Sequence, residues 1–262
     1  MDDLNNLRIL VREASKVIME VLEEYGEDSA KKVKMGAYGA PSSFVDVRAE
    51  SAILDMVEDE DMPYNVFTEE AGSIQRGYEK TIIVDPLDGS YNAEHGVPYF
   101  AVSIALARTG LEDVEAGVVR NVATGDEYHA VKGAGAYKNG RRIRVNGRRG
   151  LYVMYLGNRA HEKVFRIAEG IRRVRTMGSA SLEMCMVAEG IADVFLYLFK
   201  KRGVLRIVDI AASYLMVREA GGMVLDDSFK PLQMGLSVEE RKNVIAVADA
   251  ESLKALRSIL LS

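Results

Sequence analysis

A β-branched run leads directly into an acidic turn in TIIVDPLDGS, residues 81–90. The run predicts a buried strand that delivers two carboxylates, Asp85 and Asp88, to the end of a sheet. Gly89 lets the backbone approach a ligand closely, and Ser90 begins a short turn whose free N–H groups suit phosphate oxygens. The segment therefore holds the parts needed to bind divalent cations beside a phosphate.

Further acids stand at the ends of other apolar segments. Glu69-Glu70 follows the run 66–68, and Asp209 opens the helix-like VDIAAS at 208–213. Carboxylates of this kind, with the Leu87 carbonyl as an additional oxygen, suit Mg²⁺ or Mn²⁺ rather than zinc. Packed carboxylates repel, so their pKa values rise unless cations neutralise them. We expect these acids to meet in one metal site that hydrolyses a phosphate monoester.

Composition limits the other classes of protein. The chain has 262 residues, of which 48% are hydrophobic, enough for one compound domain or two smaller ones. Its net charge of -5 gives no general case for nucleic-acid binding, although a local basic pocket remains open. The single cysteine, Cys185, fits a reducing compartment. Without a recognisable signal peptide or a long apolar run, we expect a cytoplasmic protein with no membrane contact.

Hydrophobic periodicity predicts the element order. Apolar spacing predicts helices over 4–24 and about 46–59, the second with Asp46 and Glu50 on one face. Residues 31–45, rich in Gly, Ser and Pro, are interpreted as a mobile loop. Strands are expected early, at 64–68, 81–85, 100–107, 114–121 and 126–132. Later elements alternate as strand 151–156, helix 160–170, strand 172–177, helix 180–190, strand 192–198, helix 208–220, strands 222–226 and 243–248, and helix 250–261.

This order indicates two α/β halves that meet near residues 146–151. Residues 1–148 would carry the main metal motif, and residues 149–262 would carry Asp209 and the substrate contacts. A functional site between the two halves is expected.

The combination of motifs resembles the inositol monophosphatase family, within the Mg²⁺-dependent, lithium-sensitive phosphatases that include fructose-1,6-bisphosphatases. The matching pieces are Asp46 with Glu50, Glu69-Glu70, DPLDGS at 85–90, VDIAAS at 208–213 with Glu219-Ala220-Gly221-Gly222, Gly178-Ser179-Ala180, and Ala192-Asp193. The resemblance implies an α-β-α-β-α five-layer sandwich of the sugar phosphatase type, usually a homodimer. The pattern is most similar to archaeal members that accept both fructose 1,6-bisphosphate and inositol phosphates.

The resemblance also implies a metal-ligand set. Glu69, Asp85 and the Leu87 carbonyl resemble the ligands of one Mg²⁺. Asp85, Asp88 and Asp209 resemble those of a second, and Glu69 with water would hold a weaker third ion. Mn²⁺ would be able to substitute.

Catalytic and substrate roles follow from the same resemblance. Ser90 with Asp46 resembles the pair that orients and activates an attacking water, without a covalent phosphoenzyme, and Glu70 is an additional acid outside the metal ligands. The N–H groups of Gly89 and Ser90 would bind phosphate. Further substrate contacts are expected at Gly178 and Ser179.

Some positions depart from the family pattern. Val208 stands where Trp is frequent, and Arg202 stands where many members place a carboxylate. The basic segment 200–206, which includes Arg202 and Arg206, favours an additional anionic group on the substrate, such as a second phosphate. A solvated loop is the alternative interpretation. Tyr38 lies where similar proteins often carry Asp in the mobile catalytic loop.

Three other functions stay open. A 3′-phosphoadenosine 5′-phosphate phosphatase of the same superfamily is not separated by the sequence. A haloacid-dehalogenase-type phosphatase is disfavoured because its chemistry needs acids at D-x-D, whereas Asp85 and Asp88 are three apart. A non-catalytic, RNA-associated regulatory protein on this fold would be expected to have lost metal ligands, and all of the matched ligands are present.

Overall fold

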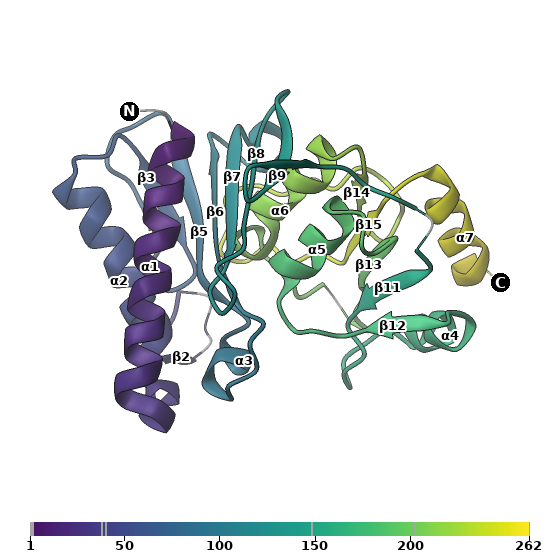
Figure 1. Ribbon diagram of the computed structural model, residues 1–262, viewed down its shortest axis with the longest axis horizontal. Coiled ribbons are helices and arrows are strands. Elements are labelled where there is room, and N and C mark those ends of the chain that lie inside the picture. The colour runs from purple at the N-terminus through teal and green to yellow at the C-terminus, as the bar shows by residue number, and fades with distance from the viewer. Residues whose placement is uncertain (1–2, 38, 40, 148, 202, 262) are drawn as a thin grey trace.

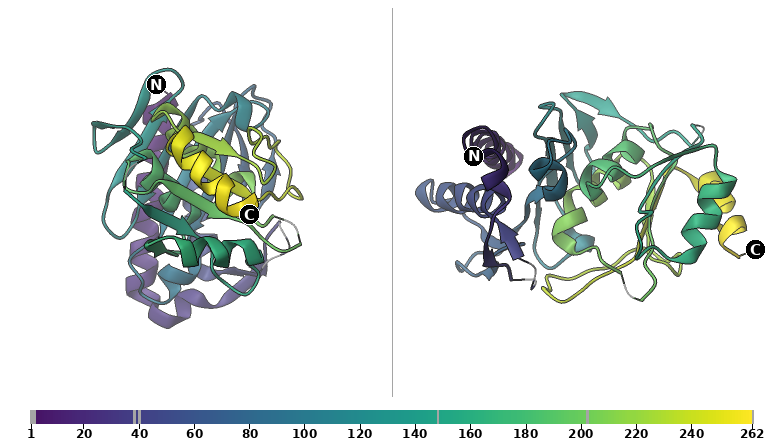
Figure 2. Two further views of the ribbon diagram at one scale, coloured as in Figure 1. Left: turned by 90° about the vertical axis from the view of Figure 1, so that its right-hand side faces the viewer. Right: turned by 90° about the horizontal axis from the view of Figure 1, so that it is seen from below.

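Helices and sheets alternate in five layers, which confirms the expected α-β-α-β-α class (Figure 1). The structure is a computed structural model, and it describes residues 3–37, 39, 41–147, 149–201 and 203–261. The pair α1 and α2 forms one outer layer, α5 and α6 lie between the two sheets, and α4 and α7 form the other outer layer, as the view from below also shows (Figure 2). The helices are α1 (Asp3–Tyr25), α2 (Phe44–Asp59), α3 (Ser90–Glu94), α4 (Glu162–Gly170), α5 (Ala180–Ala188), α6 (Ile207–Glu219) and α7 (Ala250–Leu261).

The larger sheet has eight strands in the order β10-β9-β8-β7-β6-β5-β3-β4. Its neighbours are antiparallel except for β3 and β5, which run parallel. Its strands are β3 (Asn65–Thr68), β4 (Gly72–Ile74), β5 (Thr81–Asp88), β6 (Ala101–Ala107), β7 (Ala116–Asn121), β8 (Glu127–Val131), β9 (Gly135–Lys138) and β10 (Arg141–Ile143).

The smaller sheet has five strands in the order β12-β11-β13-β15-β14. Its strands are β11 (Leu151–Met154), β12 (Arg173–Arg175), β13 (Val194–Tyr197), β14 (Met223–Leu225) and β15 (Val244–Val247). Each sheet thus draws its strands from one side of the expected boundary near residue 148, and the division into two domains remains a prediction.

Helix α6, from the second half of the chain, packs against the larger sheet. It packs against β6 and β7, and one continuous cluster of buried apolar residues includes both sheets and the helices between them. A side chain at Gly117 on β7 would place its Cβ only 2.9 Å from the Ala212 Cα of α6. The helix therefore approaches the sheet closely, and its first turn is held at the edge where β3 and β5 end.

The interpretation of residues 31–45 as a loop without regular structure was wrong, and the expected mobility stays a prediction. Residues Lys32–Met35 form β1, residues Pro41–Ser43 form β2, and the two strands pair antiparallel. The four residues of β1 are all exposed, so no apolar alternation marks the strand in the sequence. Among the helices of the described residues, none is long and apolar enough to span a membrane.

Candidate active site

Parallel pairing of β3 and β5 places Glu69 beside Asp85. Thr68 is paired with Val84 in the register of the two strands. The residue that follows each of this pair in the chain is an acid, Glu69 just after β3 and Asp85 within β5, and the carboxyl ends of parallel strands meet at the same sheet edge. The sequence pattern of two apolar runs that each end in an acid leads directly to this juxtaposition.

A bulge in β5 sets the direction of the two acids in the DPLDGS segment. Asp85 is paired with Ser103 and Asp88 with Ala101, so β5 has one residue more than β6 over this interval. Residues three apart in a regular strand point to opposite faces, and the extra residue removes that opposition. The turn is completed by Gly89, whose φ of 91° lies in the left-handed region.

Asp209 reaches the same sheet edge from the first turn of α6. Carboxylate oxygens of Glu69, Asp85 and Asp209 all lie within 4.8 Å of one another. Asp85 and Asp209 are buried, and Glu69 is partly exposed. The predicted convergence of distant acids is thus observed for these three, and their assignment as metal ligands remains a prediction.

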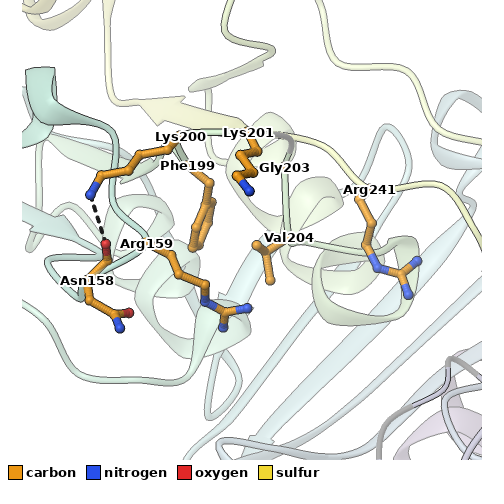
Figure 3. A pocket seen from close by; sticks show the side chains of 8 residues that line it. All are labelled: Asn158, Arg159, Phe199, Lys200, Lys201, Gly203, Val204 and Arg241. Carbon is orange, nitrogen blue, oxygen red and sulfur yellow. Dashed lines mark hydrogen bonds between the residues drawn. The ribbon is translucent and has the colours of Figure 1, made fainter.

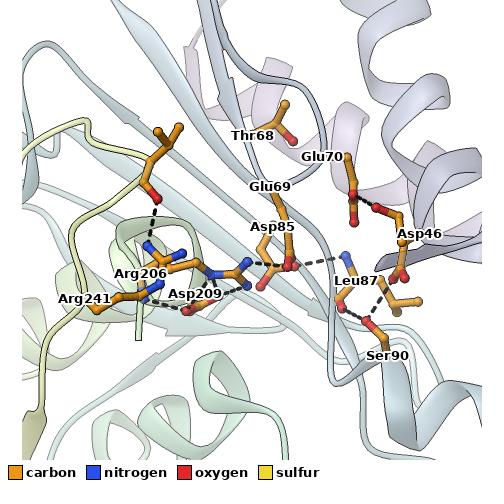
Figure 4. Close-up of polar contacts among 12 residues, drawn as sticks. Asp46, Thr68, Glu69, Glu70, Asp85, Leu87, Ser90, Arg206, Asp209 and Arg241 are labelled. Atoms are coloured by element: carbon orange, nitrogen blue, oxygen red, sulfur yellow. Dashed lines mark hydrogen bonds and ion pairs between the residues drawn. The ribbon is translucent and has the colours of Figure 1, made fainter. Parts of the chain in front are cut away.

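Arg206 lies between two of these acids (Figure 4). Its guanidinium contacts Glu69 through Nη1 and Asp209 through Nε and Nη2. Although burial alone would lower it, Asp209 and Glu69 raise the pKa of Arg206 well above its ordinary value. This pairing of Arg206 was not anticipated from the sequence, which suggested only a substrate contact.

Burial and mutual repulsion make the acids hard to ionise together. Burial, with the charge of Asp209, raises the pKa of Glu69 to about 7 despite the opposing effect of Arg206. Burial and the charge of Glu69 raise the pKa of Asp85 well above its ordinary value. A group of oxygen ligands in this condition favours a hard divalent cation, which would supply the missing positive charge.

Asp88 has a different environment from the other acids. Its carboxylate accepts hydrogen bonds from Ser179 Oγ at 2.6 Å and Ser181 N at 2.7 Å, and further bonds from Ser181 Oγ and Ala180 N. Burial raises the pKa of Asp88 even though these bonds oppose the shift. Asp88 thus contacts the start of α5, and the charge of Asp209 also raises its pKa. Its role as a metal ligand remains a prediction.

Ser90 and Asp46 form the expected hydroxyl–carboxylate pair. Ser90 Oγ lies 2.8 Å from Asp46 Oδ1 and 2.9 Å from the Leu87 carbonyl oxygen, so its single proton can be donated to either. The other Asp46 oxygen accepts hydrogen bonds from the Ser43 N–H at 3.0 Å and the Ser43 hydroxyl at 2.6 Å. Ser43 caps α2 and so fixes the direction of the Asp46 side chain.

Glu70 lines the same small cavity as Ser90 and Asp46. Its carboxylate accepts a hydrogen bond from Ser42 Oγ, and burial raises its pKa. The cavity has a volume of about 160 Å³ and is lined by Lys32, Gly36, Pro41, Asp46, Glu69, Glu70 and Ser90. The predicted catalytic residues therefore share one small cavity with one of the predicted metal ligands.

Glu50 holds the turn that carries Glu69. Its Oε1 accepts hydrogen bonds from Thr68 Oγ1 at 2.6 Å and from the backbone N–H groups of Glu70 and Ala71, each at 3.1 Å. The sequence placed Glu50 on one face with Asp46 but gave it no separate task. Its i+4 spacing from Asp46 and its place beside Asp46 among the motifs of the family resemblance were the available signals.

Of the remaining predicted substrate contacts, Ser179 is engaged with Asp88. Gly178 has a φ of 84°, and a Cβ on Gly89 would lie 3.2 Å from the Gly178 carbonyl oxygen. These glycines thus allow the two segments to approach closely. Arg202 and Tyr38 lie outside the described residues.

A basic pocket opens beside the carboxylate cluster. It has a volume of about 450 Å³, and Figure 3 shows its lining: Asn158, Arg159, Phe199, Lys200, Lys201, Gly203, Val204 and Arg241. Phe199 is buried, whereas Arg159, Lys200 and Lys201 are exposed. Val204 lines this pocket, and Arg206, two residues further on, contacts the acids. The pocket therefore combines basic residues of the segment 200–206 with Arg159 and Arg241, which come from other segments.

Comparisons with known proteins agree with this geometry. The sequence model described as the inositol monophosphatase family matches residues 3–260. A fructose-1,6-bisphosphatase/inositol-1-monophosphatase of Methanothermobacter thermautotrophicus is 37% identical over 260 residues, covering 93% of this chain and 92% of the relative. A bifunctional NADP phosphatase/NAD kinase of Methanococcus maripaludis is 33% identical, covering 84% of this chain but 43% of the relative.

A solved structure gives the same result at the level of the fold. The crystal structure of an inositol monophosphatase–fructose 1,6-bisphosphatase superimposes with a TM-score of 0.86 at 28% identity, covering 99% of this chain and 100% of the other. Sequence and fold agree over almost the full length. The chain belongs to the inositol monophosphatase family.

Proposed function

We propose that this protein is a Mg²⁺-dependent phosphomonoesterase that hydrolyses fructose 1,6-bisphosphate and myo-inositol 1-phosphate. The observation that carries the proposal is the convergence of Glu69, Asp85 and Asp209 beside the Ser90–Asp46 pair. The similar proteins named fructose-1,6-bisphosphatase/inositol-1-monophosphatase support this choice of substrates.

The donor set fits Mg²⁺. The clustered ligand atoms are carboxylate oxygens, and no soft sulfur or imidazole ligand belongs to the group found among the described residues. Glu69, Asp85 and Asp209 would hold the metal, with Asp88 and the Leu87 carbonyl as additional ligands. Bound Mg²⁺ would supply a nucleophilic water at neutral pH and neutralise the phosphate charge. Two ions, with a weaker third, are part of the proposal.

The residues Ser90, Asp46 and Glu70 would orient the attacking water and accept its proton. Ser90 Oγ can accept a hydrogen bond from the attacking water while its own proton is donated to Asp46. Asp46 keeps its orientation because Ser43 occupies its other oxygen. Glu70, already hydrogen-bonded by Ser42, offers a second acceptor in the same cavity. Direct attack by water then needs no covalent phosphoenzyme.

A bisphosphate substrate is supported by the basic pocket. Arg159, Lys200, Lys201 and Arg241 bring positive charge to one cavity of about 450 Å³, adjacent to the carboxylate cluster through residues 203–206. The phosphate that is cleaved would lie at the cluster, and the other phosphate would lie among these cations. Assembly as a homodimer is also proposed on the basis of the family resemblance, and a cytoplasmic location on the basis of the single cysteine.

Phosphate release in the presence of Mg²⁺ tests this function. The panel is fructose 1,6-bisphosphate, myo-inositol 1-phosphate, 3′-phosphoadenosine 5′-phosphate, NADP and glycerol 2-phosphate. We expect hydrolysis of the first two and its loss in Asp85→Asn. The Lys201→Ala variant should raise KM for fructose 1,6-bisphosphate and leave KM for myo-inositol 1-phosphate unchanged. Exclusive hydrolysis of NADP or 3′-phosphoadenosine 5′-phosphate, or full activity of Asp85→Asn, would contradict the proposal.

A further inference from the structure

The guanidinium of Arg206 contacts two acids of the carboxylate cluster. Nη1 contacts Glu69 Oε1, while Nε and Nη2 contact Asp209 Oδ1 at 3.1 and 2.5 Å. The Arg206 side chain is only 16% exposed. It is therefore held in place by two of the three clustered acids and is turned away from bulk solvent.

The contacted oxygens belong to the same carboxylates that form the candidate metal site. A guanidinium cannot lose its charge in a protein and has no acceptor atoms. It therefore cannot share a metal ion's surroundings as a ligand, and its charge repels a divalent cation. Because each carboxylate oxygen has a limited number of lone pairs, hydrogen bonds from Arg206 also compete with coordination at Glu69 and Asp209.

We propose that Arg206 is a displaceable counter-ion. Its guanidinium neutralises Glu69 and Asp209 when no divalent cation is bound, and metal binding requires it to leave at least one of them. The inference rests on the proposed function, because it takes the carboxylate cluster to be the metal site. It assigns to Arg206 a role in metal loading in place of the substrate contact suggested by the sequence.

The local structure permits this movement without loss of the helix. The backbone N–H of Arg206 donates a hydrogen bond of 2.6 Å to Asp209 Oδ2, an oxygen that the side-chain Nε also contacts at 3.2 Å. The start of α6 is therefore held by a main-chain contact, and the side chain can rotate away while Asp209 stays at the sheet edge. A built-in positive charge of this kind stabilises the folded cluster and weakens the apparent affinity for metal.

Metal binding by Arg206→Gln gives the direct test. The metal-depleted proteins are titrated with MgCl₂ in an isothermal titration calorimeter, without substrate. We expect the Kd of Arg206→Gln for Mg²⁺ to be lower than that of the unmodified protein by about tenfold, a usual size for coupling between two binding events. Arg218→Gln is the matched control, because Arg218 lies on the same helix and contacts Tyr214 instead. Its Kd should be unchanged.

Thermal unfolding provides a second readout that does not depend on turnover. Without metal, Arg206→Gln should have a lower Tm than the unmodified protein, because the acids lose their counter-ion. In saturating MgCl₂ the two Tm values should approach each other. If Arg206 instead stayed on both acids in the metal-bound protein, the substitution would lower Tm equally in both conditions.

An unchanged or higher Kd in Arg206→Gln would overturn the inference. Should that variant fail to fold, Arg206→Lys is the alternative, because it keeps the positive charge but loses the bidentate contact. A Kd of Arg206→Lys equal to that of the unmodified protein would also overturn the inference. If neither the unmodified protein nor Asp85→Asn bound Mg²⁺, that result would instead refute the metal site on which the proposed function depends.

Discussion

Ser179 Oγ lies 2.6 Å from Asp88 Oδ2, and this hydrogen bond joins the end of β5 to the start of α5. Asp88 belongs to the larger sheet, whereas α5 lies in the helical layer between the two sheets and comes from the second half of the chain. With the additional bonds from Ser181 and Ala180, this single carboxylate accepts four hydrogen bonds that attach the second half of the chain to the DPLDGS turn. The acid that the sequence assigns to a metal therefore also has a structural task.

Removal of one of these donors should destabilise the protein. The Ser181→Ala change deletes a hydroxyl that donates to a buried carboxylate, and such bonds contribute about 1.5–3 kcal/mol. Urea unfolding monitored by circular dichroism would measure the loss. Ser103→Ala is a matched control, because the buried Ser103 hydroxyl has no partner among the described residues. We expect that control to be neutral or slightly stabilising, and an equal loss in both variants would contradict the prediction.

Asp85→Asn should separate metal binding from folding. The substitution removes a buried acid whose pKa is raised well above its ordinary value by burial and by Glu69, so the metal-depleted protein should keep or exceed its original Tm. The increase of Tm in MgCl₂ should disappear in this variant. In the unmodified protein, a free Mg²⁺ concentration of one hundred times Kd should raise the free energy of unfolding by about 2.7 kcal/mol. Asp193→Asn is the comparison. Asp193 accepts bonds from Arg149 N and Gly150 N, so its loss should lower Tm but preserve the response to Mg²⁺.

Ser90→Ala should reduce kcat without a matching change in Mg²⁺ affinity. The variant removes the hydroxyl that, in the proposed mechanism, would link the attacking water to Asp46, and positioned acid–base groups contribute about 10²–10⁴-fold to rate. Steady-state kinetics and calorimetry would measure the two quantities. Ser42→Ala removes the comparable hydroxyl beside Glu70 and should have a smaller effect on kcat. A larger effect in Ser42→Ala would identify Glu70 as the main proton acceptor.

The ion pairs of Glu127 should contribute to stability in a pH-dependent way. Burial tends to raise its pKa, but hydrogen bonds from Arg12 and Arg8 outweigh this effect and hold the pKa below its ordinary value. The contribution is therefore complete above the ordinary pKa of about 4.3 and is lost as pH falls through the lower folded value.

Urea unfolding at pH 7 and at pH 3 would measure this dependence. Glu127→Gln should be less stable than the unmodified protein at pH 7, and the difference should shrink at pH 3. Exposed Glu23, on the same helix as Arg8 and Arg12, supplies the control variant Glu23→Gln, which should show no such trend. A constant difference between Glu127→Gln and the unmodified protein at both pH values would argue against the assignment.

The sequence predicted the elements that have regular patterns. Apolar spacing over 4–24 predicted α1, and the run before Asp85 predicted β5. The hairpin of β1 and β2 was missed because its exposed residues show no alternation and include several turn formers. Local pattern can reveal an apolar buried face, whereas β1 is exposed and the two buried residues of β2 are serines.

Long-range pairings limited the prediction of the site. Acids at the ends of strands could be expected to meet, because strand ends share a sheet edge. The contact of Arg206 with Glu69 and the bonds from α5 to Asp88 join segments that no local pattern relates. Arg159 joined the basic pocket for the same reason, since only the fold brings it to the segment 200–206.

The cluster combines oxygens from residue 69 at the end of β3 and residue 209 in α6. During synthesis the N-terminal sheet can begin to form while α6 has not yet left the ribosome. A nascent chain would therefore have Glu69 and Asp85 at the edge of its larger sheet before Asp209 completes the cluster and before Arg206 contacts Glu69. A cation bound at this cluster, as proposed, would therefore be acquired late in the life of each molecule, after most of the polypeptide has emerged.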